Sequence, residues 1–141
     1  MGSSRKQTQL RWFAVIAYSA LVALVSLGPD SGAPVIRIPH ADKIAHFGMY
    51  FLQALLLRRA MSGAGGVAPR RAFVATALEC SGYGLLLEFG QLVSTAGRSF
   101  EWLDAAANTA GAITGSFVFD WQRTFLMPRD KPERTENMEI L

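Results

Sequence analysis

The 141-residue sequence lacks most of the features that mark soluble enzymes and nucleic-acid-binding proteins. Its one cysteine, Cys80, excludes an intrachain disulfide and a zinc site built from cysteines. No H-x-x-x-H or C-x-x-C spacing, serine nucleophile elbow or phosphate-binding glycine loop is present. Charged residues make up only 18% of the chain and hydrophobic residues 50%, which excludes an intrinsically disordered protein.

What the sequence does contain is a series of long apolar runs. A helix needs about 20 mostly apolar residues to cross a bilayer, with roughly 17 as the lower limit. The first run meets this limit without any charge, and the third meets it but contains Glu79 and Glu88. The second and fourth meet it only if their polar ends lie near the membrane interface. The four runs are Trp12–Pro29, Ile44–Leu57, Ala72–Val93 and Ala105–Phe119.

The basic residues lie between these runs and alternate from one side to the other. Eleven of the 14 Lys and Arg residues fall on one side of a four-span arrangement, and only Arg37, Lys43 and Arg98 fall on the other. The positive-inside rule then places both termini in the cytoplasm. This clustering also argues against nucleic acid as a partner, although the net charge is +3.

The sequence therefore predicts an all-α membrane protein, an antiparallel bundle of four transmembrane helices. Residues 1–11 form a cytoplasmic N-terminus, residues 12–120 the transmembrane domain and residues 121–141 a charged cytoplasmic tail. The less favoured alternative is a single membrane anchor joined to a soluble helical domain.

Several polar residues inside the predicted spans share helix faces. At 100° per residue, each of the last three helices carries one such face. The predicted topology places six of these polar residues in the outer half of the membrane or at its outer surface, at the level of Arg98 in the loop between the third and fourth helices. The six are Asp42, His46, Glu88, Gln91, Asp104 and Asn108. The faces consist of Asp42, His46, Tyr50 and Gln53; of Glu88 and Gln91; and of Asp104, Asn108, Gly111 and Gly115.

Burying these groups is costly, so they require partners. A charged side chain at a helix centre costs roughly 2.5–3.5 kcal/mol on the insertion scale. Intramembrane ionisable residues usually face the bundle interior and are functional candidates by default. Structural alternatives stay open: Gln53 and Asn108 could serve only as interhelical hydrogen bonds, and Asp42 could serve only as an N-cap. The small residues Ala107, Gly111 and Gly115 predict close helix packing, within the chain or in a homo-oligomer.

These residues together resemble a known family. The segment Asp42-Lys43-Ile-Ala-His46-Phe-x-x-Tyr50, then Glu88-x-x-Gln91, Arg98, Asp104 and Asn108-x-x-Gly111, is similar to the VanZ-like family of small bacterial integral membrane proteins. The resemblance covers about residues 10 to 120, and Glu101 and Trp102 depart from the lead-in expected before Asp104. It implies a multi-pass protein of the bacterial inner (cytoplasmic) membrane. The family is named for a teicoplanin-resistance protein, so the resemblance also implies a link to the cell envelope and to antibiotic resistance.

Three functions follow as hypotheses. The favoured one is a binding protein whose outer polar pocket holds a membrane lipid, a lipid-linked envelope ligand or an antibiotic, with Lys43 and Arg98 able to hold a phosphate or carboxylate. The second is an intramembrane transferase or hydrolase with the catalytic candidates His46, Glu88 and Asp104. His46 would be the general base, Asp104 or Asp42 would orient it, and Glu88 would be the acid or a second base. The third is an assembly subunit that uses the Gly111/Gly115 face. No cofactor or metal is expected. The predicted ligand-binding set is Asp42, Lys43, His46, Tyr50, Glu88, Gln91, Arg98, Asp104 and Asn108.

Overall fold

The protein folds as four helices in the residues that its structure, a computed structural model, describes. These residues are 2–28, 40–62, 68–93 and 100–126. Helices α2, α3 and α4 contain the second, third and fourth apolar runs and extend beyond them, whereas α1 begins ten residues before the first run and ends at Leu27, within it. Pro69 opens the third helix at its first position, where its missing N–H needs no partner. The helices are α1 (Gly2–Leu27), α2 (Ala41–Ser62), α3 (Pro69–Val93) and α4 (Trp102–Phe125).

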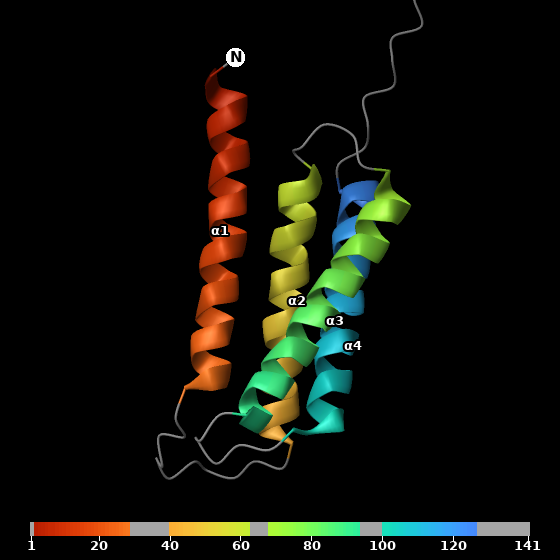
Figure 1. The fold of residues 1–141 in the computed structure, drawn as a ribbon. Coiled ribbons are helices and arrows are strands. Elements are labelled where there is room, and N and C mark those ends of the chain that lie inside the picture. The colour runs from red at the N-terminus through yellow and green to blue at the C-terminus, as the bar shows by residue number, and fades with distance from the viewer. Residues whose placement is uncertain (1, 29–39, 63–67, 94–99, 127–141) are drawn as a thin grey trace, which may run out of the picture.

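Successive helices run in opposite directions, as the sequence predicted (Figure 1). The N-terminus of α1, the end of α2, the start of α3 and the end of α4 lie at one end of the bundle, which we call the N-terminal end. The start of α2, the end of α3 and the start of α4 lie at the other, which we call the far end. Helix α1 stands apart from the other three and contacts α2 and α3; between the described parts of α1 and α4 there are no contacts.

Helices α2 and α4 form the most extensive contact, and two glycines allow it. A Cβ atom on Gly111 would lie 2.3 Å from the backbone oxygen of Phe47, and one on Gly115 would lie 2.4 Å from that of Phe51. Only a residue without a side chain lets the α2 backbone approach this closely. The small-residue face of α4 therefore packs within the chain, and a homo-oligomer through this face would have to displace α2.

Hydrogen bonds attach α1 to the rest of the bundle. Little of the apolar surface of α1 is buried against the other helices, since large side chains along it are exposed. These are Leu10, Phe13, Ile16 and Leu24. Hydrogen bonds from polar side chains of α1 and of its neighbours α2 and α3 make the specific contacts instead. These bonds join Tyr18 Oη to the Met49 oxygen at 3.2 Å, Gln53 Nε2 to Ser19 Oγ at 3.2 Å, Tyr83 Oη to the Ser19 oxygen at 2.6 Å and Gln91 Nε2 to the Ser26 oxygen at 3.0 Å.

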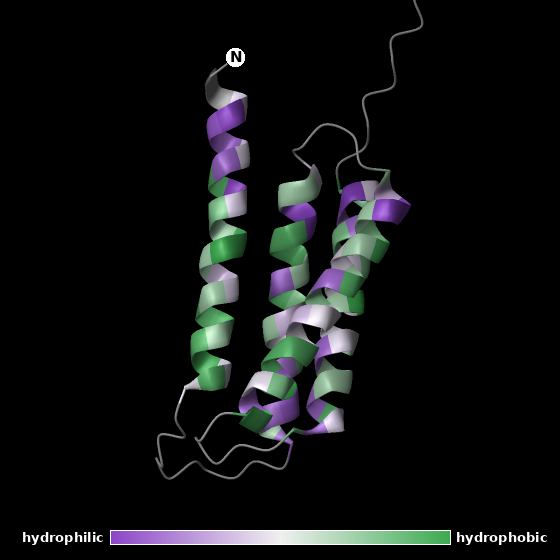
Figure 2. Ribbon diagram, in the orientation of Figure 1, coloured by the Kyte–Doolittle hydropathy of each residue, from purple (hydrophilic) through white to green (hydrophobic). Residues whose placement is uncertain are grey.

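The bundle buries several polar side chains beside its apolar core and exposes many large apolar side chains, which is unlike a soluble domain. Large hydrophobic side chains on all four helices are exposed, and α1 and α3 are each long and apolar enough to cross a bilayer, over Ser4–Leu27 and Pro69–Val93. Figure 2 shows the apolar stretch along α1 below its hydrophilic first turns. An apolar exterior is stable in lipid, whereas in water it would be an aggregation surface. The buried polar residues are Ser26, Gln53, Arg58, Thr76, Glu88, Gln91, Asp104, Asn108 and Ser116.

Candidate functional site

The far end of the bundle holds a group of polar side chains from α2, α3 and α4, which we call the polar cluster. The antiparallel order of the helices brings the start of α2, the end of α3 and the start of α4 to one level, as the sequence predicted (Figure 1). Contacts between side chains then join residues that lie up to 62 positions apart in the chain. The polar cluster consists of Asp42, Lys43, His46, Glu88, Glu101, Asp104 and Asn108.

Lys43 is the centre of one half of this cluster. Its Nζ lies 2.6 Å from Asp42 Oδ2, 3.0 Å from Glu101 Oε2 and 3.1 Å from Asp104 Oδ1. Hydrogen bonds to these carboxylates, first of all to Asp42, raise the pKa of the Lys43 ammonium well above its usual value. The same contact lowers the pKa of Asp42. Lys43 can donate three hydrogen bonds and makes all three here, so it is not available as the free anion-binding cation that the sequence suggested.

His46 is the centre of the other half. Its Nδ1 lies 3.0 Å from Asn108 Oδ1, and because that oxygen can only accept, Nδ1 carries the proton. Nε2 lies 3.8 Å from Asp104 Oδ2, and Glu88 Oε1 lies 3.9 Å from Nδ1. These two separations are too long for direct hydrogen bonds but short enough for a bridging water, ion or ligand atom.

Glu88 is the most deeply buried carboxylate of the cluster. Only 1% of its surface is exposed, and it lies within α3, one of the two helices apolar enough to span a membrane. Within the described residues its one hydrogen bond comes from the backbone N–H of Glu101, which donates to Oε2 at 3.4 Å. This weak contact leaves Oε1 directed toward His46 and Asp104. A buried acid with so little direct compensation is typical of a functional site rather than of a stabilising contact.

The structure brings most, but not all, of the predicted site residues together. Tyr50 is buried to 1% exposure and lies beside Gly84, where a Cβ would be 3.2 Å from its ring. Gln91 bonds α1 instead of the cluster, as does Gln53. Arg98 lies outside the described residues.

Sequence reasoning missed Glu101 as a member of the site. Glu101 occupies the N-cap position of α4 in an extended conformation, yet its side chain makes no capping bond. Its carboxylate accepts from Lys43 instead, and its backbone N–H reaches Glu88. The signal was present, since Glu101 stood out as a departure from the expected lead-in to Asp104.

Carboxylates outnumber cations in the described part of the cluster, with four acidic side chains around one lysine and one histidine. Two sets of side chains converge closely enough to share a cation. Asp42, Glu101 and Asp104 form one set, and the Lys43 ammonium already lies among them. The other set is His46, Glu88 and Asp104, whose ligand atoms lie within 4.8 Å of one another, so it is the place in the cluster where a positive or hydrogen-bond-donating group fits.

A second polar contact, at the N-terminal end, was also missed. Arg58 is only 2% exposed, pairs with Asp120, donates to the Pro69 oxygen at 3.4 Å and lies over the Phe119 ring at 5.3 Å. The sequence placed Arg58 among the loop charges. Antiparallel helices bring an arginine that follows the second apolar run next to an aspartate that follows the fourth. Because its charge is paired and buried, Arg58 serves the packing of α2 on α4.

Comparison with known proteins supports the resemblance found in the sequence. A family model described as VanZ/LLP1 matches residues 2–123, which is most of the chain and includes every described member of the polar cluster. No curated protein and no solved structure matches.

Proposed function

The chain belongs to the VanZ/LLP1 family of membrane proteins, and from this membership and the polar cluster we propose that it binds a ligand of the cell envelope at the far end of the bundle. In the predicted topology this end faces the outside of the inner membrane, where lipids, lipid-linked envelope precursors and lipoglycopeptide antibiotics are accessible. The apolar exterior of the bundle suits the acyl or polyprenyl part of such a ligand.

The observation that carries this proposal is the convergence of buried Glu88 with His46 and Asp104. Three separate helices each supply one ionisable group, and His46 lies 3.9 Å from Glu88 and 3.8 Å from Asp104, so neither carboxylate makes a close ion pair with it. A purely structural contact would be expected to close these separations, because a buried charge is stable only when it is well paired. Open distances between converging buried groups favour a site that a further group completes.

The charge of the cluster indicates which part of the ligand it recognises. With Lys43 saturated by three carboxylates, the remaining acceptors are those of Glu88, His46 and Asp104. A protonated amine or a set of hydroxyl donors satisfies these acceptors directly, whereas an isolated phosphate would be repelled. We therefore infer that the polar contact is made by an amine-bearing or hydroxyl-rich head group.

Native mass spectrometry of the protein purified in mild detergent tests the proposal. We expect a retained envelope lipid or lipid-linked ligand in the wild type and its loss in His46→Gln, a variant that removes the imidazole but keeps polarity. Gln53→Ala, which removes a polar contact to α1 outside the cluster, is the matched control and should keep the ligand. Retention by both variants, or no ligand in the wild type, would contradict ligand binding at the cluster; an empty site would favour an assembly subunit.

A second function is supported by the tautomer of His46. In neutral His46 with its proton on Nδ1, donated to Asn108 Oδ1, the Nε2 lone pair would be free to act as a base toward a water or hydroxyl group. Asp104 Oδ2, 3.8 Å away, would stabilise the imidazolium that forms. This arrangement fits an intramembrane hydrolase or transferase. A modified product, rather than an unchanged ligand, in the same mass spectra would identify this function.

A further inference from the structure

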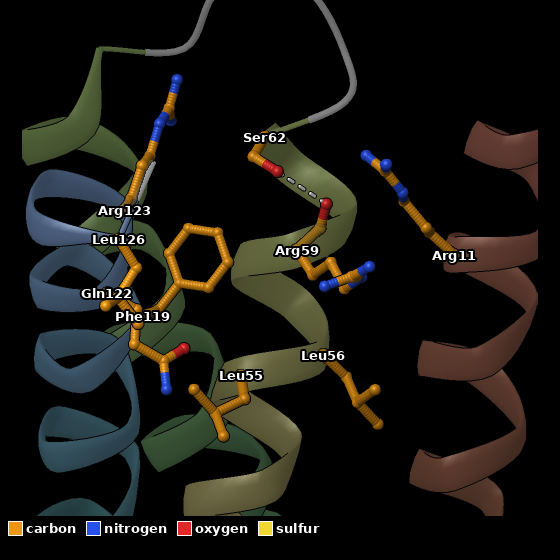
Figure 3. A pocket seen from close by; sticks show the side chains of 9 residues that line it. All are labelled: Arg11, Leu55, Leu56, Arg59, Ser62, Phe119, Gln122, Arg123 and Leu126. Carbon is orange, nitrogen blue, oxygen red and sulfur yellow. Dashed lines mark hydrogen bonds between the residues drawn. The ribbon is translucent and has the colours of Figure 1, made fainter. Parts of the chain in front are cut away.

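A cavity at the N-terminal end of the bundle lies opposite the polar cluster. It has a volume of about 430 Å³ and is formed by α1, α2 and α4. Three arginines line it, and no acidic side chain does: Arg11 comes from α1, Arg59 from α2 and Arg123 from α4 (Figure 3). This cavity shares no residue with the polar cluster and is therefore a separate feature of the molecule.

The three arginines have no carboxylate partner among the residues that the structure describes. Arg58, the neighbour of Arg59, pairs with Asp120, and this is the one arginine ion pair in the described helices. Arg11 and Arg59 extend toward each other from facing helices (Figure 3). Like charges directed at one space repel each other, and an anion between them converts this repulsion into charge-assisted hydrogen bonds.

Apart from Ser62 and Gln122, the rest of the lining is apolar. Leu55 and Leu56 of α2 lie below the arginines, toward the middle of the bundle, and the Phe119 ring of α4 lies at the level of Arg59 (Figure 3). Free phosphate would use only the arginines and leave this surface without a partner. A molecule with a charged head and an apolar chain would use both parts.

We propose that this cavity binds an anionic membrane lipid. Its phosphate lies between Arg11 and Arg59, with Arg123 at the α4 side of the cavity, and its acyl chain lies against Leu55 and Phe119. Arginine recognises phosphate through a planar set of parallel N–H donors. Basic pockets between helices at the cytoplasmic face of a membrane are suited to phosphate head groups. The predicted topology places this end of the bundle at that face.

The experiment compares two double variants. Arg59→Gln with Arg123→Gln removes two of the cavity arginines, and Arg70→Gln with Arg71→Gln removes two exposed arginines of α3 that do not line the cavity. Both variants lower the net charge equally. Each protein is titrated in mild detergent with phosphatidylglycerol, phosphatidylcholine or inorganic phosphate, and bound lipid and the thermal midpoint are measured.

We expect phosphatidylglycerol, but not phosphatidylcholine, to bind and to raise the thermal midpoint of the wild type. Each cavity arginine should contribute about fivefold in affinity, so the cavity variant should bind ~25-fold more weakly and the α3 variant about as well as the wild type. If both variants bind phosphatidylglycerol equally weakly, the lipid is attracted by basic charge in general and not by this cavity, and the proposal is overturned. Equal stabilisation by inorganic phosphate would show a free-anion site and overturn the assignment to a lipid.

Discussion

The packing of α4 on α2 gives a prediction whose magnitude follows from two distances. In Gly111→Ala the new Cβ would lie 2.3 Å from the Phe47 oxygen, about 1 Å closer than the normal carbon–oxygen contact of roughly 3.3 Å. The atom that the new Cβ would meet belongs to the α2 backbone, so a whole helix would have to move, not only a side chain. Overpacking of this kind costs about 1–3 kcal/mol. Gly115→Ala, with its Cβ 2.4 Å from the Phe51 oxygen, should behave in the same way.

The same substitution also removes the conformational freedom of glycine, which stabilises a helix by roughly 0.5–1 kcal/mol. Gly48→Ala and Gly82→Ala are matched controls, because a Cβ at either position has no atom within 4 Å. We expect these two variants to be as stable as the wild type or more so. The difference between Gly111→Ala and Gly82→Ala then isolates the packing cost, about 1–3 kcal/mol.

Denaturant and thermal unfolding in mild detergent measure this difference. The midpoints of Gly111→Ala and Gly115→Ala should fall below those of Gly48→Ala and Gly82→Ala by several degrees. If all four variants unfold together, α2 and α4 do not approach each other at these glycines, and the packing argument fails.

Three further predictions concern orientation, the site and its charge. A periplasm-active reporter should be active in the 29–39 segment and inactive after the last residue; the opposite result would reverse the topology. Gly84→Ala places a Cβ 2.9 Å from Asn108 Nδ2, so it should reduce ligand retention more than it lowers stability, and an equal loss of both would remove Asn108 from the site. Lys43 lowers the pKa of Asp42, so the stabilisation from this pair should be present above pH ~4 and disappear as the pH falls through the lowered pKa; stability that falls equally with pH in Asp42→Asn would contradict this.

The sequence predicted the helices and the level of the polar cluster, because both depend on local patterns. Apolar runs determined where each helix lies, and the small residues at Gly111 and Gly115 indicated the face of α4 that meets α2. Antiparallel order then placed His46, Glu88 and Asp104 at one level. The four-span topology and the position of the termini remain predictions, since only α1 and α3 meet the length and hydropathy of a membrane span.

The sequence could not predict which partner each polar side chain contacts. That depends on how each helix is rotated about its axis and on which neighbouring helix the side chain is long enough to contact. Gln91 shares a face with Glu88 at a spacing of three residues, yet it bonds α1, which lies to one side of that face. Glu101 joins the site through the geometry of the turn before α4 rather than through a helical period. The Arg58–Asp120 pair could likewise be predicted only if it were known that α2 packs more extensively on α4 than on α3.

The most direct test of the central claim compares two glutamates on α3. Glu88 is buried in the polar cluster, whereas Glu79 on the same helix is exposed and makes no hydrogen bond or ion pair within the described residues. Ligand retention by native mass spectrometry and thermal stability in detergent are measured for Glu88→Gln and Glu79→Gln. The account predicts that Glu88→Gln loses the ligand while its stability is unchanged or higher, because the variant removes a poorly compensated buried acid. Glu79→Gln should keep both properties. Ligand retention by Glu88→Gln, or loss of ligand and stability together, would show that the polar cluster is structural.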